Sequence, residues 1–439
     1  MSKPPEAGKI LLRSVFKLLS QIILDSGRPY WTEERLRETP VGQLRYKLFL
    51  TSFLILFFEL ACIRWIPATV RLMGYFMNFV LLAAFLGIGV GILSGRHRRL
   101  WLPSFPLMFF LLVTTVATGR VELKLTSLDV LYFGGESAVQ PERVYLLPII
   151  FVLVALSFAP LARSLGNLLT ARPPLEAYAI DIGGSLAGIA AFFVMSLYGM
   201  PPLVWFGLAA AAYLLLSQIK ELPLAIPLMI GSLFAIYQVS IGSIWSPYYR
   251  ISILPSDQGG YVINVNNTQH QATLPYQKKE TFYFRVYDLF PEVTFERVLV
   301  LGAGTGSDVM IALANGAEKV DAVEIDPLIK QLGFSLNPDR PYDDQRVKVF
   351  VEDGRTFLRN TMDQYDLIVY ALPDSLTLTS AYSSLRLESF LLTADSLSEA
   401  RRHLSPDGLV VLYNYYRQPW LIYKLAGMVE SAFGAAPFV

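Results

Sequence analysis

Residues 298–306, Val-Leu-Val-Leu-Gly-Ala-Gly-Thr-Gly, decide the fold of the C-terminal half of this chain. The apolar run predicts a buried strand, and Gly302, Gly304 and Gly306 permit a tight turn and a close approach of the backbone to a ligand. The helix after such a loop offers free N–H groups at its first turn. A second expected strand ends on Glu324, which is placed to accept the ribose hydroxyls of an adenosine-containing cofactor. Strand, loop, helix and acid together predict a nucleotide-binding α/β domain.

Strands and helices alternate around this motif, which predicts a parallel sheet with right-handed crossovers and helices on both faces. Before them, strands at 251–254 and 261–265 about the turn Gly259-Gly260 predict a small antiparallel lid, and 278–290 is expected to be helical. The expected strands of the large sheet are 297–301, 319–324, 346–351, 365–370 and 408–413, and the expected helices are 306–315, 327–335, 354–361, 384–404 and 418–433.

The third strand of the large sheet ends in Glu352-Asp353-Gly354. A carboxylate there can accept the exocyclic amine of an adenine, while Gly354 lets the backbone pass close to the ring. Asp353 could instead cap the helix that follows. In isolation the two interpretations are even, and the glycine loop and Glu324 favour the adenine contact.

The first half of the chain is dominated by apolar residues. Of 439 residues, 53% are hydrophobic and 17% are charged, and the mean hydropathy of +0.43 is too high for a purely soluble protein. Cys62 is the single cysteine, which excludes an internal disulfide and a cysteine metal cluster, and no metal site is expected. The net charge of +1, without a basic tract, argues against a nucleic-acid partner. Seven stretches are long enough, or nearly so, to cross a bilayer core of about 20 residues: 48–66, 73–93, 101–118, 144–162, 178–200, 203–218 and 222–242.

Basic residues predict the orientation in the membrane. Residues 1–47 carry nine Lys/Arg and lack a signal-peptide cleavage site, and 9–24 predicts an amphipathic helix on the membrane face. If this segment is cytoplasmic, so are the other basic clusters. Seven spans would then place 243–439 outside, where an adenosylated cofactor is not normally available. We therefore expect a cytoplasmic cofactor domain and a span count wrong by one, through a re-entrant segment at 121–133 or a marginal segment that does not cross. The other basic residues are Arg96, Arg98, Arg99, Arg163, Arg172 and Lys220.

Two carboxyl groups fall inside expected spans, Glu59 in the first and Asp181 in the fifth. Such groups are costly in lipid unless they are paired or functional. We expect them to pair with Arg64, Arg71 or polar groups on other helices; the alternative is that they line a substrate pocket. Small-residue stripes predict close helix contacts, and they are Gly87-x-x-x-Gly91 and Gly184-x-x-x-Gly188.

These motifs resemble those of the spermidine synthases, within the larger class of S-adenosylmethionine-dependent methyltransferase folds. The resemblance covers residues 246–413 and implies S-adenosylmethionine or its decarboxylated form as the cofactor. The apolar half is similar to spans fused to such domains in some bacterial proteins, which implies an integral protein of the bacterial inner (plasma) membrane. The matching stretches are Ser246-Pro247-Tyr248, Gly302–Gly306, Val323–Pro327, Glu352–Leu358 and Tyr365–Val369 in the domain, and Glu59…Arg64, Phe85–Gly91 and Tyr178–Asp181 in the spans.

The expected acceptor site departs from this family. Soluble aminopropyltransferases place an aspartate after the fourth strand to deprotonate the amine, whereas this chain has Tyr370 there and Asp374 further along the loop. A tyrosine with a pKa of about 10 is a poor base. The family's acidic polyamine stretch is replaced by 277–285, whose Lys278, Lys279 and Arg285 do not favour a cation. The candidate catalytic residues are Asp374 and Tyr370, and the candidate substrate-binding residues are Tyr248, Tyr249, Gln269 and Tyr283.

Tyrosines such as these, with Tyr382 and 413–416, either line a pocket for an apolar or aromatic acceptor or act as interfacial anchors, and the two interpretations are even. A sheet of this class usually ends in a hairpin after its fifth helix, so the stop at Val439 predicts that the last strands are missing.

We therefore predict a multi-span α-helical membrane domain followed by an α/β Rossmann-like S-adenosylmethionine-dependent methyltransferase/spermidine synthase domain. The expected function is transfer of a methyl group to an amphipathic acceptor. The alternatives are polyamine aminopropyl transfer with a displaced base, and a non-catalytic cofactor-sensing or transport protein. The expected partners are the lipid bilayer and a small-molecule acceptor, with a homodimer left open. The expected divisions are a cytoplasmic segment at 1–47, about seven spans in 48–242, a β lid and linker at 243–290 and the cofactor domain at 291–439.

Overall fold

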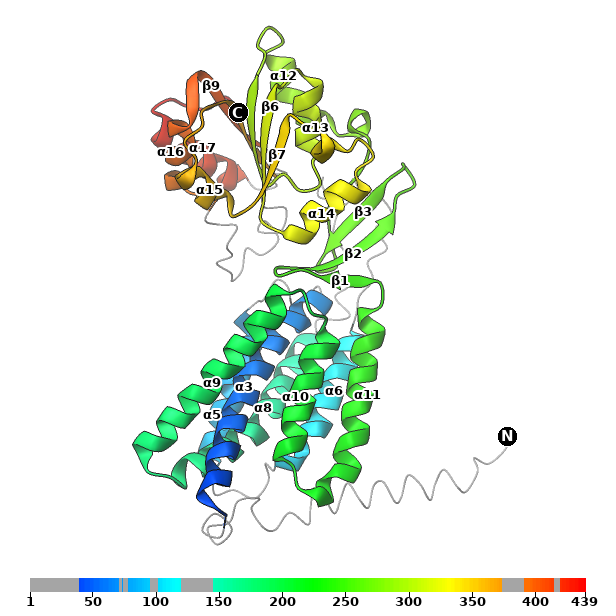
Figure 1. The fold of residues 1–439 in the computed structure, drawn as a ribbon, viewed down its shortest axis with the longest axis vertical. Coiled ribbons are helices and arrows are strands. Elements are labelled where there is room, and N and C mark those ends of the chain that lie inside the picture. The colour runs from blue at the N-terminus through cyan, green and yellow to red at the C-terminus, as the bar shows by residue number, and fades with distance from the viewer. Residues whose placement is uncertain are drawn as a thin grey trace, which may run out of the picture. The chain divides into compact units, whose positions relative to one another are not determined.

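The computed structural model describes residues 39–70, 73, 78–94, 102–119, 145–372, 391–413 and 419–439. The described chain divides into two compact units, a helical unit that ends at Ile241 and an α/β unit that begins at Gly242 (Figure 1). The amphipathic helix expected at 9–24 and the segment 121–133 lie outside the described residues.

Each of the seven apolar stretches forms a helix. By length and composition, four helices could cross a membrane: Val41–Thr69, Leu146–Thr170, Pro174–Leu197 and Ile219–Ser240. The other three are shorter apolar helices, and the number of spans stays a prediction. The bounds are α3 Val41–Thr69, α5 Asn78–Leu93, α6 Phe105–Thr118, α8 Leu146–Thr170, α9 Pro174–Leu197, α10 Pro202–Leu216 and α11 Leu222–Ser240, with 3₁₀ turns at Leu102–Ser104 and Ile219–Glu221.

The helical unit packs through aromatic rings and through small residues. The ring of Phe58 lies 5.1–6.0 Å from four other rings, so α3 is held among α6, α8 and α10. A Cβ atom on Gly184 or Gly188 would meet the backbone of α3, which confirms the predicted close contact of these glycines. Gly87 and Gly91 of α5 lie against the backbone of α8 in the same way. The four rings around Phe58 belong to Phe105, Phe109, Phe158 and Phe206.

A four-stranded antiparallel sheet opens the α/β unit, in the order β1-β2-β3-β4. The predicted pair, β2 Arg250–Pro255 and β3 Tyr261–Val265, is confirmed, with Ile253 opposite Ile263. The flanking strands β1 Ser243–Trp245 and β4 Thr268–Ala272 carry no apolar alternation of their own, so the sequence did not indicate them. One face of this sheet packs on helix α14 (Pro327–Leu336), through Ile251, Ile263, Val265, Ile329 and Leu332.

The helix expected at 278–290 is wrong over its first half. The structure has 3₁₀ turns at Tyr276–Lys278 and Thr281–Phe284, and only Arg285–Leu289, α12, is α-helical. Lys279 and Glu280 are extended between the two turns. The Lys279 ammonium there donates to the Ala272 carbonyl at 2.5 Å, a contact made with another element that local helical spacing does not encode.

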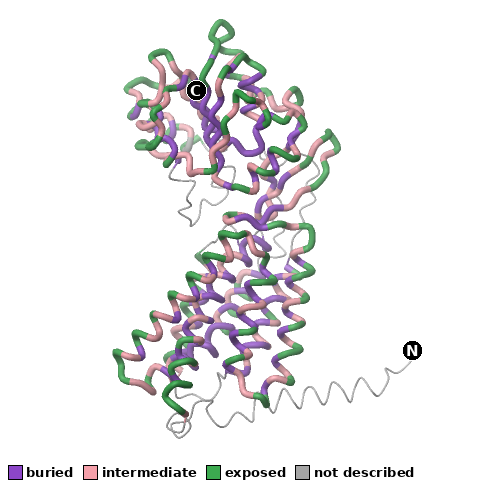
Figure 2. Tube along the Cα trace, viewed as in Figure 1, coloured by how far each residue is buried: buried purple, intermediate pink, exposed green. Residues whose placement is uncertain are grey.

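The large sheet is parallel, in the order β7-β6-β5-β8-β9, with helices on both faces (Figure 1). Its central strands β5, β6 and β8 are buried over most of their length (Figure 2), because apolar side chains pack against α12 and α13 on one face and against α15, α16 and α17 on the other. The bounds are β5 Arg297–Leu301, α13 Ser307–Ala314, β6 Lys319–Glu324, α14 Pro327–Leu336, a 3₁₀ turn Pro341–Asp343, β7 Val347–Val351, α15 Gly354–Asn360, β8 Tyr365–Ala371, α16 Ala394–Arg402, β9 Leu404–Tyr413 and α17 Pro419–Phe433.

Most of these elements lie within two residues of the prediction. The exceptions are α16 and β9. Of the helix expected at 384–404, residues 384–390 lie outside the described residues, 391–393 are not helical and α16 begins at Ala394, while β9 begins at Leu404 rather than at 408. Strand order reverses between β5 and β8, so the loops after their carboxyl ends diverge. In open α/β sheets ligands bind at such a point, and the glycine loop follows β5.

Candidate functional site

The glycine loop has the backbone conformation that the sequence predicts. Gly302, Gly304 and Gly306 have φ angles of 80°, 57° and 93°, a region that residues with a Cβ atom enter only at a cost. The N–H groups of Gly302 and Ala303 donate to the carbonyl of Val323 at 2.9 and 3.0 Å, so the loop is anchored to β6. The loop then enters α13 directly, with Gly306 as the N-cap residue.

Glu324 lies at the carboxyl end of β6 and is 6% exposed. Its Oε2 accepts from the N–H of Gly304 at 2.8 Å, and its Oε1 accepts from the N–H of Asp326 at 2.9 Å. Burial raises the pKa of this carboxyl to about 7, against the lowering effect of these hydrogen bonds. Glu324 therefore shapes the glycine loop, and a carboxylate with two oxygens can also accept a further donor such as a ribose hydroxyl.

Three residues that the sequence did not single out hold the loop from outside. Gln271 of β4 accepts through Oε1 from the N–H and the hydroxyl of Thr305 at 3.0 and 3.1 Å. The phenol of Tyr342 donates to the Gly304 carbonyl at 2.7 Å, and the Asn337 amide donates to the Thr305 carbonyl at 2.8 Å. No local pattern marks these side chains, because each reaches the loop from a distant element.

The pKa of the Tyr248 phenol is raised, first by burial and then by the charges of Asp326, Asp353 and Glu324. The turn that carries Tyr248 is anchored by Ser246, whose hydroxyl donates to Asp326 and accepts from the N–H of Tyr248 at 3.1 Å.

Asp353 caps α15, which was the simpler of the two interpretations. Its Oδ1 accepts from the N–H and the hydroxyl of Thr356 at 2.9 and 3.1 Å. The adenine contact is not tested by this geometry and stays a proposal. The ring of Tyr249 packs against the small-sheet core, 6.3 Å from the ring of His270 and 6.2 Å from that of Tyr248.

Aromatic rings gather beside the 3₁₀ turns. The ring of Tyr283 lies 4.4 Å from that of Phe282 and 5.6 Å from that of Tyr413 at the end of β9. The Lys279 ammonium lies 5.6 Å from the Tyr283 ring centroid. Burial lowers the pKa of this ammonium, while nearby carboxylates, Asp308 of α13 among them, oppose the shift.

Asp308 is a further acid that the sequence analysis missed. It lies in the first turn of α13, and burial raises the pKa of its carboxyl to about 7 while the Lys279 charge lowers it.

The remaining predicted substrate residue, Gln269, is 8% exposed on β4, and its amide nitrogen has no hydrogen-bond partner among the described residues.

Tyr370 does not suit the role of a base. It is fully buried in the core that β8 shares with α15–α17, and its phenol lies 3.3 Å from the Ser396 carbonyl and 3.2 Å from its hydroxyl. Burial raises the pKa of this phenol to about 12, so it stays protonated at neutral pH. Asp374 and Tyr382 lie outside the described residues.

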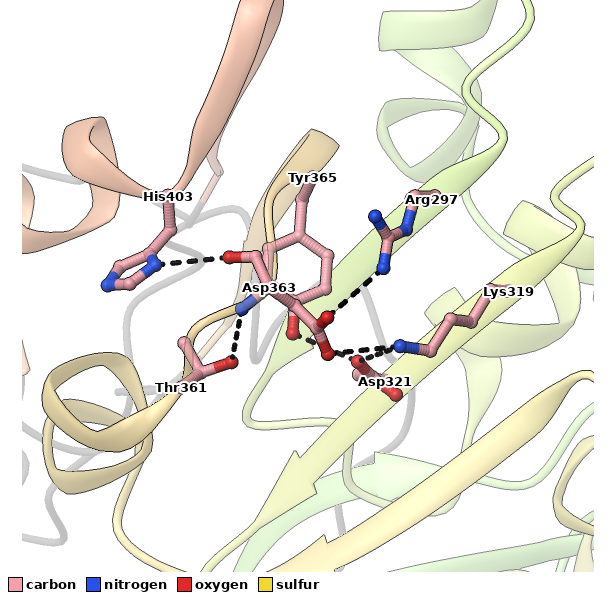
Figure 3. Close-up of polar contacts among 7 residues, drawn as sticks. All are labelled: Arg297, Lys319, Asp321, Thr361, Asp363, Tyr365 and His403. Atoms are coloured by element: carbon pink, nitrogen blue, oxygen red, sulfur yellow. Dashed lines mark hydrogen bonds and ion pairs between the residues drawn. The ribbon is translucent and has the colours of Figure 1, made fainter.

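A second polar cluster lies at the opposite, amino edge of the large sheet (Figure 3). Asp321 is 1% exposed and accepts from the phenol of Tyr365 at 2.9 Å, with the Lys319 ammonium at 3.4 Å. The same ammonium lies 3.1 Å from Asp363, which also pairs with Arg297 at 3.2 Å. These contacts join the starts of β5, β6 and β8, so we assign the cluster to stability of the sheet.

Comparison with known proteins finds similarity in the C-terminal half of the chain. Residues 288–435 match the family model described as "Spermine/spermidine synthase domain". The polyamine aminopropyltransferase of Clostridium beijerinckii is 27% identical over 190 residues, which are 42% of this chain and 62% of that protein. Polyamine aminopropyltransferase 1 of Streptomyces coelicolor is 32% identical over 145 residues, 31% of this chain and 25% of that protein.

A solved structure also aligns with part of the chain. Spermidine synthase from Thermotoga maritima aligns with a TM-score of 0.34 and 17% identity, covering 44% of this chain and 65% of that one. The chain spans about three fifths of the length of the first curated relatives that it matches.

Proposed function

Because the C-terminal half of this chain is a spermine/spermidine synthase domain preceded by long apolar helices, we propose that its α/β unit transfers an aminopropyl group to an amine acceptor. The donor would be decarboxylated S-adenosylmethionine. The similarity to polyamine aminopropyltransferases supports this reaction over the methyl transfer that the sequence analysis favoured. The unit would work at the cytoplasmic face of the bacterial inner membrane, where this donor is available.

One observation carries the proposal: a glycine loop and a buried glutamate converge at the carboxyl edge of the sheet. Glu324, at the tip of β6 and beside the loop, suits the ribose hydroxyls of an adenosyl group. Asp353 keeps Oδ2 for the adenine amine, since its bonds to Thr356 fall on Oδ1. These residues fit an adenosyl cofactor.

When bound, the cofactor would supply a sulfonium-activated propyl carbon, and methylthioadenosine would leave as the acceptor nitrogen bonds to that carbon. The protein must orient the acceptor and receive its proton. Tyr370 is excluded from the second task by its burial and high pKa. Asp374 remains our proposal for the base, on its position after β8.

The test uses the full chain in detergent micelles. Calorimetry should detect binding of methylthioadenosine and of decarboxylated S-adenosylmethionine, and mass spectrometry should detect spermidine formed from putrescine. Binding of the decarboxylated donor without any product would favour the cofactor-sensing alternative. Binding and turnover with S-adenosylmethionine alone would restore the methyl-transfer hypothesis.

A further inference from the structure

Glu59 of the helical unit is a buried carboxyl that lacks a full set of protein partners. It lies in the middle of α3, is 4% exposed, and its Oε1 makes no hydrogen bond to any described residue. An ionised carboxylate in such surroundings costs several kcal/mol unless a positive charge or several donors face it. Glu59 must therefore hold either a proton or an external cation.

A second carboxyl, that of Asp181 on α9, contacts the same face of α3 through Ser52. Ser52 lies seven residues before Glu59, so both side chains project from one helix face, about 10 Å apart along the axis. The Ser52 hydroxyl donates to Oδ1 of Asp181 on α9 at 2.6 Å. The two acids therefore lie along one face of α3 inside an apolar bundle. Asp181 accepts from a neutral donor, whereas Oε1 of Glu59 has no donor among the described residues.

The ion pairs described in this unit include neither acid. Arg64 donates to the hydroxyl of Ser196 and lies 5.1 Å from the Trp205 ring centroid. Arg45 and Arg172 both bind Glu176, at 2.6 and 2.7 Å, at the start of α9. The other charged residues on helices packed against α3 are Lys47 of α3 itself and Arg163 of α8, and no ion pair among the described residues includes Glu59 or Asp181.

We propose that Glu59 is a cation-exchange site of the helical unit, which holds a proton when empty and binds the ammonium group of an aliphatic amine in its place. The exchange is balanced: the carboxyl releases its proton to water as the ammonium binds the carboxylate. The choice of an aliphatic amine rests on the aminopropyl transfer proposed for the α/β unit, whereas the cation site rests on Glu59 alone.

The surroundings favour an organic ammonium over a metal ion. Sodium and calcium need several oxygen ligands, and the described residues contain no cluster of acidic, histidine or cysteine side chains that could hold a metal. An ammonium group needs no such cluster, because one carboxylate can accept its N–H groups in charge-assisted hydrogen bonds.

Carbodiimide labelling of the full chain in lipid nanodiscs tests the proposal. Dicyclohexylcarbodiimide modifies protonated carboxyls in apolar surroundings, and peptide mass spectrometry locates the product. We expect Glu59 to be labelled and Glu176, which is paired with two arginines, to be unlabelled. Putrescine at about ten times its Kd should lower the labelling of Glu59 about tenfold, and sodium chloride at equal ionic strength should not.

Proton release provides a second readout. Adding putrescine to weakly buffered wild-type protein should acidify the solution, and Glu59→Gln should abolish this change while Glu176→Gln retains it. An unlabelled Glu59, equal protection by sodium, or unchanged acidification in Glu59→Gln would each overturn the proposal. Binding of methylthioadenosine by Glu59→Gln at the wild-type Kd separates these outcomes from any failure of the α/β unit.

Discussion

The backbone N–H of Gly304 donates to the buried carboxylate of Glu324 at 2.8 Å, so the residue proposed to bind ribose also sets the shape of the glycine loop. The bond joins the loop after β5 to the tip of β6. Binding and folding are therefore coupled at this one side chain, and its substitution will affect both.

Replacement of Glu324 by alanine should weaken adenosyl-cofactor binding by about 1.5–3 kcal/mol, the scale of hydrogen bonds to a charged group. Calorimetry with methylthioadenosine measures the change, and Glu318→Ala, in the turn before β6, is the control. An unchanged Kd in Glu324→Ala would refute the ribose assignment.

Stability of the α/β unit should fall as the pH rises from about 5 to 7. The pKa of Glu324 and that of Asp308 are both raised to about 7 by burial, so the folded state keeps protons that the unfolded state has already lost. Proton binding by the folded state favours folding at the acidic end of this window, and the advantage is lost as pH passes the folded pKa. Thermal unfolding across the window should show a falling Tm, with a smaller fall in Glu324→Gln. A Tm that rises with pH in both proteins would contradict these assignments.

Gly304→Ala should destabilise the α/β unit by about 1–3 kcal/mol, the range for a strained backbone position. The φ angle is +57°, and an added Cβ would lie 2.5 Å from Oε1 of Gln271, which already binds Thr305. Chemical denaturation measures the loss. Gly427→Ala is the matched control, because that helical glycine has nothing within 4 Å of the new atom and should become more stable by up to about 1 kcal/mol. Equal behaviour of the two variants would argue against a left-handed backbone at Gly304.

Tyr370→Phe should keep the rate of spermidine formation within about twofold of wild type while losing about 1 kcal/mol of stability, because its phenol bonds only to Ser396 in the described core. Asp374→Asn should lower the rate by at least about a hundredfold if Asp374 is the base. Steady-state assays with putrescine decide between them. A large loss of rate in Tyr370→Phe with an intact fold would return the base to that tyrosine.

Tyr365→Phe should destabilise the domain by about 1–3 kcal/mol, since it removes a donor from the buried carboxylate of Asp321. The cluster lies at the amino edge of the sheet, so the Kd for methylthioadenosine should not change. Asp395→Asn provides the comparison, because that carboxylate is 83% exposed and its pairing with Arg355 contributes little. A weakened cofactor affinity in Tyr365→Phe would show that the two edges are coupled.

Local patterns in the sequence were enough for much of the fold. The run 298–306 predicts its strand, turn and helix because apolar periodicity and glycine dihedrals are properties of neighbouring residues. The alternation after it indicated the five parallel strands in the same way, and the apolar stretches indicated the seven helices. The segment around Lys279 was predicted wrongly to be helical. The Lys279 ammonium bonds to the carbonyl of Ala272 on another element, and the spacing of neighbouring residues does not encode such a contact.

The sequence by itself determined that this chain joins apolar helices to an α/β sheet with a glycine loop, since the spacing of apolar residues over a few positions indicates both. Only the tertiary structure decided which polar groups meet. In the tertiary structure the side chain of Tyr370 is buried in the core, Gln271 bonds to Thr305, and Oε1 of Glu59 has no partner among the described residues. Such meetings depend on residues far apart in the chain, and the free energy of a buried polar group depends on all of its neighbours at once.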